Sequence, residues 1–183
     1  MAKDVKGIQL SQVRELNQLK ITRVFNEKWL PNLVKHPRPQ RPGLGLTGYL
    51  KHIQDGRIQI FGKTEAGYLS NLKEGETGRC LKNYFSLRLP GVIVAENIDP
   101  AVEWIAMAAR YSTPILVSAL HTAPLISRLS AYLYQYFSKK IKLNGVLMDV
   151  MGQGVLITGA SGIGKSETAL ELVNKGYQLI ADD

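Results

Sequence analysis

Short hydrophobic runs alternate with amphipathic stretches over most of the chain. The runs are rich in Val and Ile and bounded by polar or turn-forming residues, which is typical of buried strands. The amphipathic stretches repeat hydrophobic residues at three- and four-residue spacing, as helices with one buried face do. This pattern predicts strands at 57–61, 92–95 and 115–118, and helices at 12–20, 65–72, 99–111 and 122–138.

Residues that favour helix starts precede three of these helices. Ser11 and Thr122 carry hydroxyls that can accept a hydrogen bond from the unpaired N–H groups of a first turn, and Asp99 followed by Pro100 suits an N-cap and first turn. Four prolines between 31 and 42 predict an extended connection. The repeated alternation of strand and helix predicts an α/β fold, with a parallel α/β domain at residues 1–130.

Residues 131–183 have a different layout. Strands are expected at 145–150 and 155–158 with a tight turn between them, then a helix at 167–175 ending at Gly176, and a strand at 177–181. Two or three strands and one helix cannot cover both faces of a sheet, so the chain is expected to stop inside this second domain.

The composition, 45% hydrophobic and 21% charged, is ordinary for a soluble globular protein. Cys80 is the single cysteine and cannot form an internal disulfide. The first residues lack the apolar core of a signal peptide, and no apolar stretch is long enough for a membrane span. These features favour a cytoplasmic protein without a membrane partner.

The formal charge of +8 is unevenly distributed. Residues 1–63 hold 12 of the 23 Lys and Arg but only 4 of the 15 Asp and Glu. Because these basic residues are scattered and no aromatic-rich motif accompanies them, we expect no nucleic-acid partner. A solvated basic face and an acidic partner both remain open.

Residues 159–166 match the phosphate-binding loop pattern G-x-x-x-x-G-K-[ST], between a predicted strand and a predicted helix. Glycines let successive N–H groups converge on one anion, and a helix N-terminus adds a positive dipole end. Lys165 can reach the β- and γ-phosphates, and Ser166 can offer its hydroxyl to Mg²⁺. A turn that merely joins strand and helix is the alternative. The expected nucleotide-binding residues are Gly159, Ala160, Ser161, Gly162, Ile163, Gly164, Lys165 and Ser166.

Residues 145–183 resemble the start of the catalytic domain of HPr kinase/phosphorylase, through G-V-L-M-D-V, the loop, S-E-T-A-L-E-L and the final A-D-D. Residues 41–44, 57–65 and 92–95 resemble that family's N-terminal domain more weakly. The resemblance implies a P-loop kinase fold similar to phosphoenolpyruvate carboxykinase. It implies a bacterial enzyme of carbon catabolite regulation that uses ATP, or pyrophosphate, and Mg²⁺ to phosphorylate a serine of HPr, catalyses the reverse phosphorolysis, and forms hexamers.

The resemblance also assigns roles. Lys165 would hold the transferred phosphoryl group, Ser166 would bind the metal, and Asp183 would take the serine proton. Asp182, one residue away on a strand, would point to the opposite side. Both aspartates can instead be simple polar residues that end a strand.

The chain departs from the family at Asn144, where the family has an active-site histidine. Asparagine can form hydrogen bonds but cannot move a proton near neutral pH. His121 is expected to cap or pack rather than to substitute for that histidine. The family's catalytic domain continues with a further Mg²⁺ ligand, an arginine and a helical part that holds HPr, so we expect the 183-residue chain to be inactive alone. A non-catalytic nucleotide or phosphate sensor with a partner-binding domain is the alternative.

Overall fold

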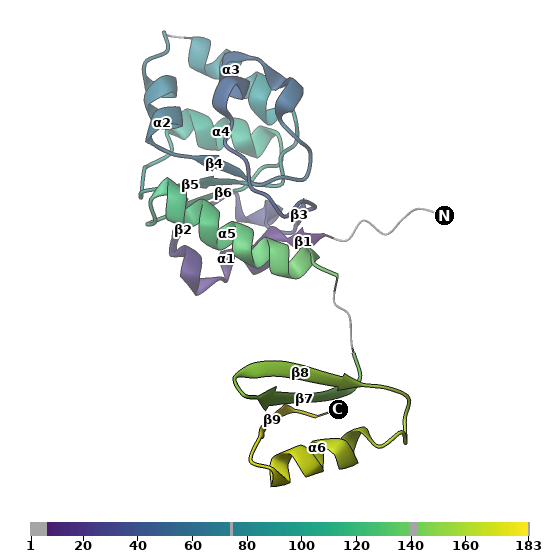
Figure 1. Ribbon diagram of the computed structural model, residues 1–183. Coiled ribbons are helices and arrows are strands. Elements are labelled where there is room, and N and C mark those ends of the chain that lie inside the picture. Colours follow the sequence, from purple (N-terminus) through teal and green to yellow (C-terminus); the bar gives the residue numbers. More distant parts are fainter. Residues whose placement is uncertain (1–6, 74, 140–142, 183) are drawn as a thin grey trace, which may run out of the picture. The chain divides into compact units, whose positions relative to one another are not determined.

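The computed structural model describes residues 7–73, 75–139 and 143–182. The chain divides into two compact units, Met1–Ser138 and Lys139–Asp183 (Figure 1). Helix α5 (Thr122–Phe137) is continuous across residue 130 and lies wholly in the first unit.

The first unit is built on a four-stranded sheet. Three parallel strands lie side by side, and β2 pairs antiparallel with β6 at one edge, in the order β2-β6-β5-β4. The α/β prediction with a parallel sheet is confirmed, whereas β2 was not predicted. The strands are β2 (Ile21–Phe25), β4 (Gln59–Phe61), β5 (Val92–Val94) and β6 (Ile115–Ser118).

Helices cover both faces of this sheet (Figure 1). Ile93 of β5 packs in a cluster with residues of α1 (Leu10–Arg14) and α5. Its neighbours Val92 and Val94 pack on the other side, against α2 (Lys63–Ser70), α3 (Glu76–Phe85) and α4 (Val102–Arg110). Alternate residues of a strand point to opposite faces, so a sheet covered twice needs continuous hydrophobic strands.

Several predicted helix starts are wrong. The helix expected at 12–20 is the short α1 followed by a 3-10 turn at Asn17–Leu19, and Ser11 lies inside α1 rather than at its N-cap. Helix α4 begins at Val102 with Ala101 at its N-cap, and Asp99 instead forms an ion pair with Arg23. Thr122 is the first residue of α5, and its hydroxyl contacts Glu96.

The proline-rich segment is an extended connection, as predicted, but it also contributes to sheets. It contains β3 (Leu33–Val34), which pairs antiparallel with β1 (Ile8–Gln9), and an isolated bridge from Gln40 to Gln59. Short 3-10 helices lie on both sides of it, at Glu27–Trp29, Gly43–Thr47 and Leu50–His52.

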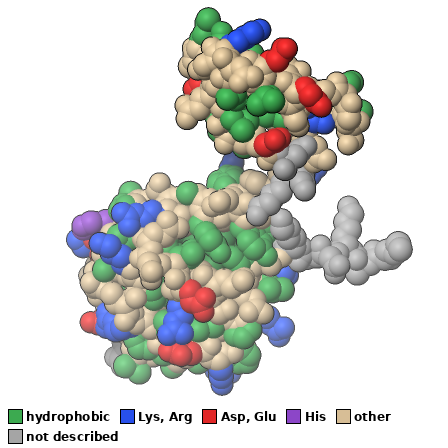
Figure 2. Space-filling view, turned by 90° about the horizontal axis from the view of Figure 1, so that it is seen from below, with side chains coloured by type: hydrophobic (Ala, Val, Ile, Leu, Met, Phe, Trp, Pro, Cys, Tyr) green, Lys and Arg blue, Asp and Glu red, His purple; other side chains and the backbone are tan. Residues whose placement is uncertain are grey.

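The second unit is a three-stranded antiparallel sheet with one helix (Figure 1). Its strand order is β8-β7-β9, with α6 connecting β8 to β9. Val146 and Met148 of β7 and Ala169 of α6 form its buried core, and hydrophobic side chains remain at its surface (Figure 2). The elements are β7 (Gly145–Val150), β8 (Gln153–Thr158), α6 (Lys165–Asn174) and β9 (Gln178–Ala181).

The hairpin and the helix end predicted in this unit are confirmed. Met151 and Gly152 join β7 to β8, and both have positive φ, at 54° and 77°. Gly176, with φ of 91°, follows the C-terminus of α6. In the described part of the chain, no helix has the length and hydrophobicity needed to cross a membrane.

Candidate phosphate-binding site

The loop at 159–164 leaves β8 and leads directly into α6. Gly162 has φ of 79°, and Gly164, the N-cap of α6, has φ of 98°. Side chains rarely adopt this left-handed backbone, so glycine is the residue that suits these two turns. The loop therefore brings the chain sharply from the strand into the N-terminus of the helix.

Lys165 opens α6 and folds back over the loop. Its Nζ donates hydrogen bonds to the carbonyl oxygens of Gly159 and Ala160, each at 3.1 Å. The ammonium group has three donors, so these contacts leave one for another acceptor. The side chain thus places a positive charge above the loop.

The first turn of α6 exposes further donors. Thr168 donates hydrogen bonds from both its N–H and its hydroxyl to the carbonyl oxygen of Gly164, so its own donors are satisfied. Ser166 is exposed, and within the described residues its hydroxyl has no hydrogen-bond partner. The N–H groups of a first turn lack partners inside the helix, and the positive end of the helix dipole lies there.

The topology brings other predicted site residues to the same edge of the sheet. Strand β7 runs opposite to β8 and β9, so the start of β7 lies beside the ends of both. Gly145 pairs with Thr158, the residue before the loop, and Asn144 directly precedes Gly145. Asp182 follows Ala181, which pairs with Leu147. Asp183, the predicted proton acceptor, lies outside the described residues.

Close backbone contact sets the position of Asn144. A Cβ at Gly145 would lie 2.5 Å from the carbonyl oxygen of Ile157, a distance that real side chains do not tolerate. Glycine at this position lets β7 and β8 pair up to the start of the loop. Asn144 and Asp182 are both exposed, so their side chains are accessible to a ligand at this edge.

The donors at this edge suit phosphate oxygens. A flexible glycine backbone, a helix N-terminus, an ammonium group and an unpartnered hydroxyl all favour a multiply charged oxyanion. Among the described residues, no three His, Cys, Asp or Glu side chains form a metal-binding group. Ser166 could offer its hydroxyl to a Mg²⁺ ion beside bound phosphates, as the Ser or Thr at this position does in phosphate-loop proteins.

The structure also shows a charged cluster in the first unit that sequence reasoning missed. Glu96 Oε2 lies 2.9 Å from Lys63 Nζ and 3.2 Å from His121 Nδ1. The pKa of Glu96 is lowered, first by the hydrogen bond from Lys63. His121 occupies the N-cap position of α5 without a side-chain capping bond. These residues follow three neighbouring parallel strands, and that sequence signal could have located the cluster.

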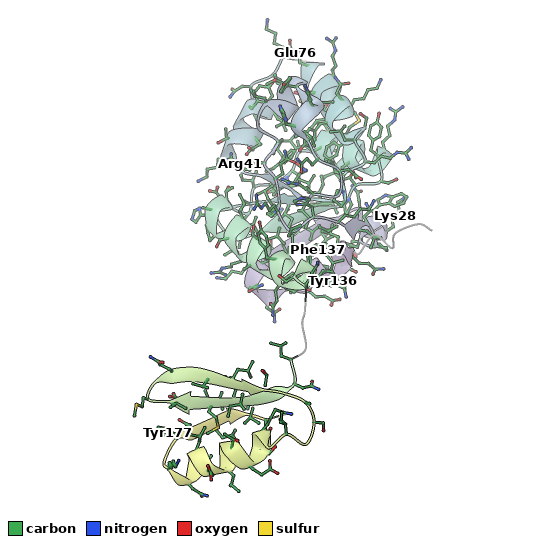
Figure 3. All side chains as sticks on the ribbon, turned by 45° about the vertical axis from the view of Figure 1, so that its right-hand side comes forward. Lys28, Arg41, Glu76, Tyr136, Phe137 and Tyr177 are labelled. Atoms are coloured by element: carbon green, nitrogen blue, oxygen red, sulfur yellow. The ribbon has the colours of Figure 1, made fainter. Side chains whose placement is uncertain are left out.

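Beside this cluster, Arg41, which is labelled in Figure 3, forms an ion pair with the buried carboxylate of Glu65. Its Nε and Nη2 bind the two carboxylate oxygens at 3.0 and 2.9 Å, and Glu65 also accepts the Gly62 N–H at 2.9 Å. The arrangement closes the first turn of α2. Its partners satisfy one another, so it serves the structure of the unit.

Comparison with known proteins gave two family matches that together span nearly the whole chain. The model of the HPr Serine kinase N terminus matches residues 8–133, and that of the HPr Serine kinase C-terminal domain matches residues 135–183.

Among solved structures, the chain is similar to the CBS and DRTGG domains of the regulatory region of Clostridium perfringens pyrophosphatase, a complex with the activator diadenosine tetraphosphate. The identity is 16% and the TM-score 0.46, over 79% of this chain and 59% of that one. The chain thus spans less than two thirds of that structure's length.

Proposed function

Because this chain belongs to the HPr serine kinase family, we propose that it takes part in ATP-dependent phosphorylation of a serine of HPr and in the reverse phosphorolysis. One observation carries the proposal beyond family membership. The loop, Lys165, Asn144 and the end of β9 share one edge of the small sheet. A phosphate bound by the loop would lie at the same edge of the sheet as Asn144 and the end of β9.

Each residue has a role in this proposal. The N–H groups of the loop and α6 bind nucleotide phosphates, and Lys165 neutralises the charge of the transferred phosphoryl group. Ser166 would hold Mg²⁺ through its hydroxyl, and the ion would supply positive charge to the phosphates. Asp183 takes the proton from the attacking serine and returns it in the reverse direction. Pyrophosphate is the second donor in this proposal, because the loop offers its N–H groups to phosphates rather than to a base.

The units then correspond to the family's N-terminal domain and to part of its P-loop catalytic domain. In this proposal the protein acts in the cytoplasm as a hexamer. We propose that the 183-residue chain binds nucleotide but does not transfer phosphate. The family resemblance calls for an acidic metal ligand and an arginine in addition to Lys165 and Ser166, and an arginine stabilises the charge of the transition state.

The test separates binding from transfer. Titration of the chain with a fluorescent ATP analogue and Mg²⁺ should show saturable binding, and Lys165→Ala should weaken it by about tenfold or more, since a charge-assisted phosphate contact is lost. Lys175→Ala, at the other end of α6, is the matched control and should change little. The same mixture with HPr should yield no phosphoserine above the Lys165→Ala background. Absent ATP binding would refute the proposal, and phosphoserine production would refute inactivity.

A second function, a non-catalytic nucleotide sensor, is favoured by one observation. Asn144 lies beside the loop, where the resemblance calls for a histidine, and it cannot carry a proton. The chain extended with the family's remaining catalytic segment distinguishes the two. An enzyme should phosphorylate HPr in this form, and Asn144→His should raise the rate. A sensor should bind ATP, remain inactive in both forms and gain nothing from the histidine.

A further inference from the structure

A cavity in the first unit lies at the end of its sheet opposite to the Glu96 cluster. It has a volume of about 640 Å³, enough for a small metabolite. Its walls come from the segments that lead into β4, β5 and β6, together with the segment around β3. The lining residues are Asn32, Leu33, Lys35, Asp55, Arg88, Pro90, Arg110, Tyr111 and Ser112.

Positive charge dominates this lining. The lining contains three basic side chains, Lys35, Arg88 and Arg110, and one carboxylate, Asp55. The formal net charge of the lining is therefore +2. The Lys35 ammonium lies 3.8 Å from Asp55, which is a loose contact. Among the described residues, the side chains of Arg88 and Arg110 have neither an ion pair nor a hydrogen bond.

A purely structural explanation accounts for only part of this charge. Helices α3 and α4 both end near the cavity, and Arg110 occupies the last turn of α4. A basic residue at a helix C-terminus gains roughly 0.3–1 kcal/mol from the dipole. This explains one arginine at the end of α4, but it does not explain why Lys35, from a separate segment, converges on the same space. Each guanidinium also has five donors, which remain available to a ligand.

The backbone around the cavity is held in an unusual conformation. Arg88 and Ser112 have φ of 53° and 58°, a left-handed backbone normally taken by glycine. Asn32 Nδ2 donates to the Ser112 carbonyl at 2.8 Å, and the Lys35 N–H donates to Gly56 at 2.9 Å. These hydrogen bonds connect the segment around β3 to the segments that lead into β4 and β6.

We propose that this cavity binds a small molecule with two or more negative charges, a polycarboxylate or a phosphate ester. The guanidinium groups of Arg88 and Arg110 and the Lys35 ammonium bind the anionic groups. Asn32, Ser112 and Tyr111 offer neutral hydrogen bonds to the rest of the ligand. The site belongs to the first unit and is independent of the loop at 159–166.

The test uses the full chain at low ionic strength, with citrate and inorganic pyrophosphate as probes in isothermal titration calorimetry. Pyrophosphate is added to the Lys165→Ala chain, so that the loop does not contribute. Citrate binding alone indicates a polycarboxylate ligand, and pyrophosphate binding alone indicates a phosphate ligand. We expect the double variant Arg88→Asn, Arg110→Gln to weaken binding by about tenfold or more.

Two further variants make the result decisive. Arg128→Gln removes the same charge from α5 and should change affinity by less than about twofold. Asp55→Asn removes the opposing charge and should tighten binding by roughly threefold, which a damaged fold could not do. The proposal fails if neither probe binds, if Arg128→Gln weakens binding as much as the double variant, or if Asp55→Asn does not tighten it.

Discussion

Glu96 shows how single charges stabilise the first unit. Its carboxylate accepts hydrogen bonds from Lys63 and His121, and its pKa lies below the ordinary glutamate value chiefly because of Lys63. The folded state therefore binds the Glu96 proton less readily than the unfolded state does. The resulting stabilisation is complete above the ordinary pKa and is lost as the pH falls through the lowered one.

Thermal unfolding measured between neutral pH and about pH 3 tests this coupling. The wild-type chain should be more stable than Lys63→Gln near neutral pH, and the difference should shrink once Glu96 is protonated. Lys82→Gln removes an exposed lysine of α3 that has no ion pair among the described residues. Its unfolding temperature should differ from that of the wild type by the same amount at every pH. A difference in unfolding temperature between wild type and Lys63→Gln that stays constant down to pH 3 would contradict the role of Lys63.

At the scale of elements, the β7–β8 hairpin depends on its two-residue turn. Positive φ at both central residues defines a type I′ turn, which matches the twist of the strands and favours Asn-Gly. Met151 occupies the first position with its side chain 84% exposed, so it contributes little packing. Met151→Asn should stabilise the hairpin by about 0.5–1 kcal/mol, and Gly152→Ala should destabilise it by about 1 kcal/mol.

Amide hydrogen exchange of β7 and β8 measures both effects. Gly154→Ala serves as the control, because this strand glycine has ordinary φ and open space around it. The turn assignment is wrong if Gly154→Ala destabilises the hairpin as much as Gly152→Ala does, or if Met151→Asn speeds amide exchange in β7 and β8.

The elements also show where sequence patterns suffice. The hairpin and the loop at 159–166 could be predicted because their determinants are consecutive residues with local chemistry. Strand β2 was missed because only one side of it is paired, so it keeps polar Thr22 and Arg23. Helix α1 is shorter than predicted. Leu16 has an extended backbone, and its side chain packs against the hydrophobic cluster that includes α5. The Glu96 cluster joins residues far apart in sequence, and only the parallel sheet brings them together.

At the scale of the whole molecule, the two units differ in how much they bury. The first has hydrophobic clusters on both faces of its sheet, whereas the described core of the second is Val146, Met148 and Ala169. Stability from burial grows with the apolar area removed from water, so the second unit should open more easily. Its strands expose Leu156 and Ile180, at 44% and 54%, which adds nothing to its core.

Hydrogen exchange of the full chain should therefore show faster exchange in β7 and β8 than in β5 and β6. Trp29 and Trp104, the only tryptophans, both lie in the first unit. Their fluorescence should therefore report unfolding at a higher temperature than the one at which the amides of β7 lose their protection from exchange.

ATP with Mg²⁺ should slow exchange in the loop and in α6 and leave β5 unchanged, because a ligand stabilises the unit that binds it. Lys165→Ala should abolish that protection without altering the tryptophan transition. Equal protection of both units without ligand would contradict the difference in core size, and ATP-dependent protection of β5 would place nucleotide binding in the wrong unit.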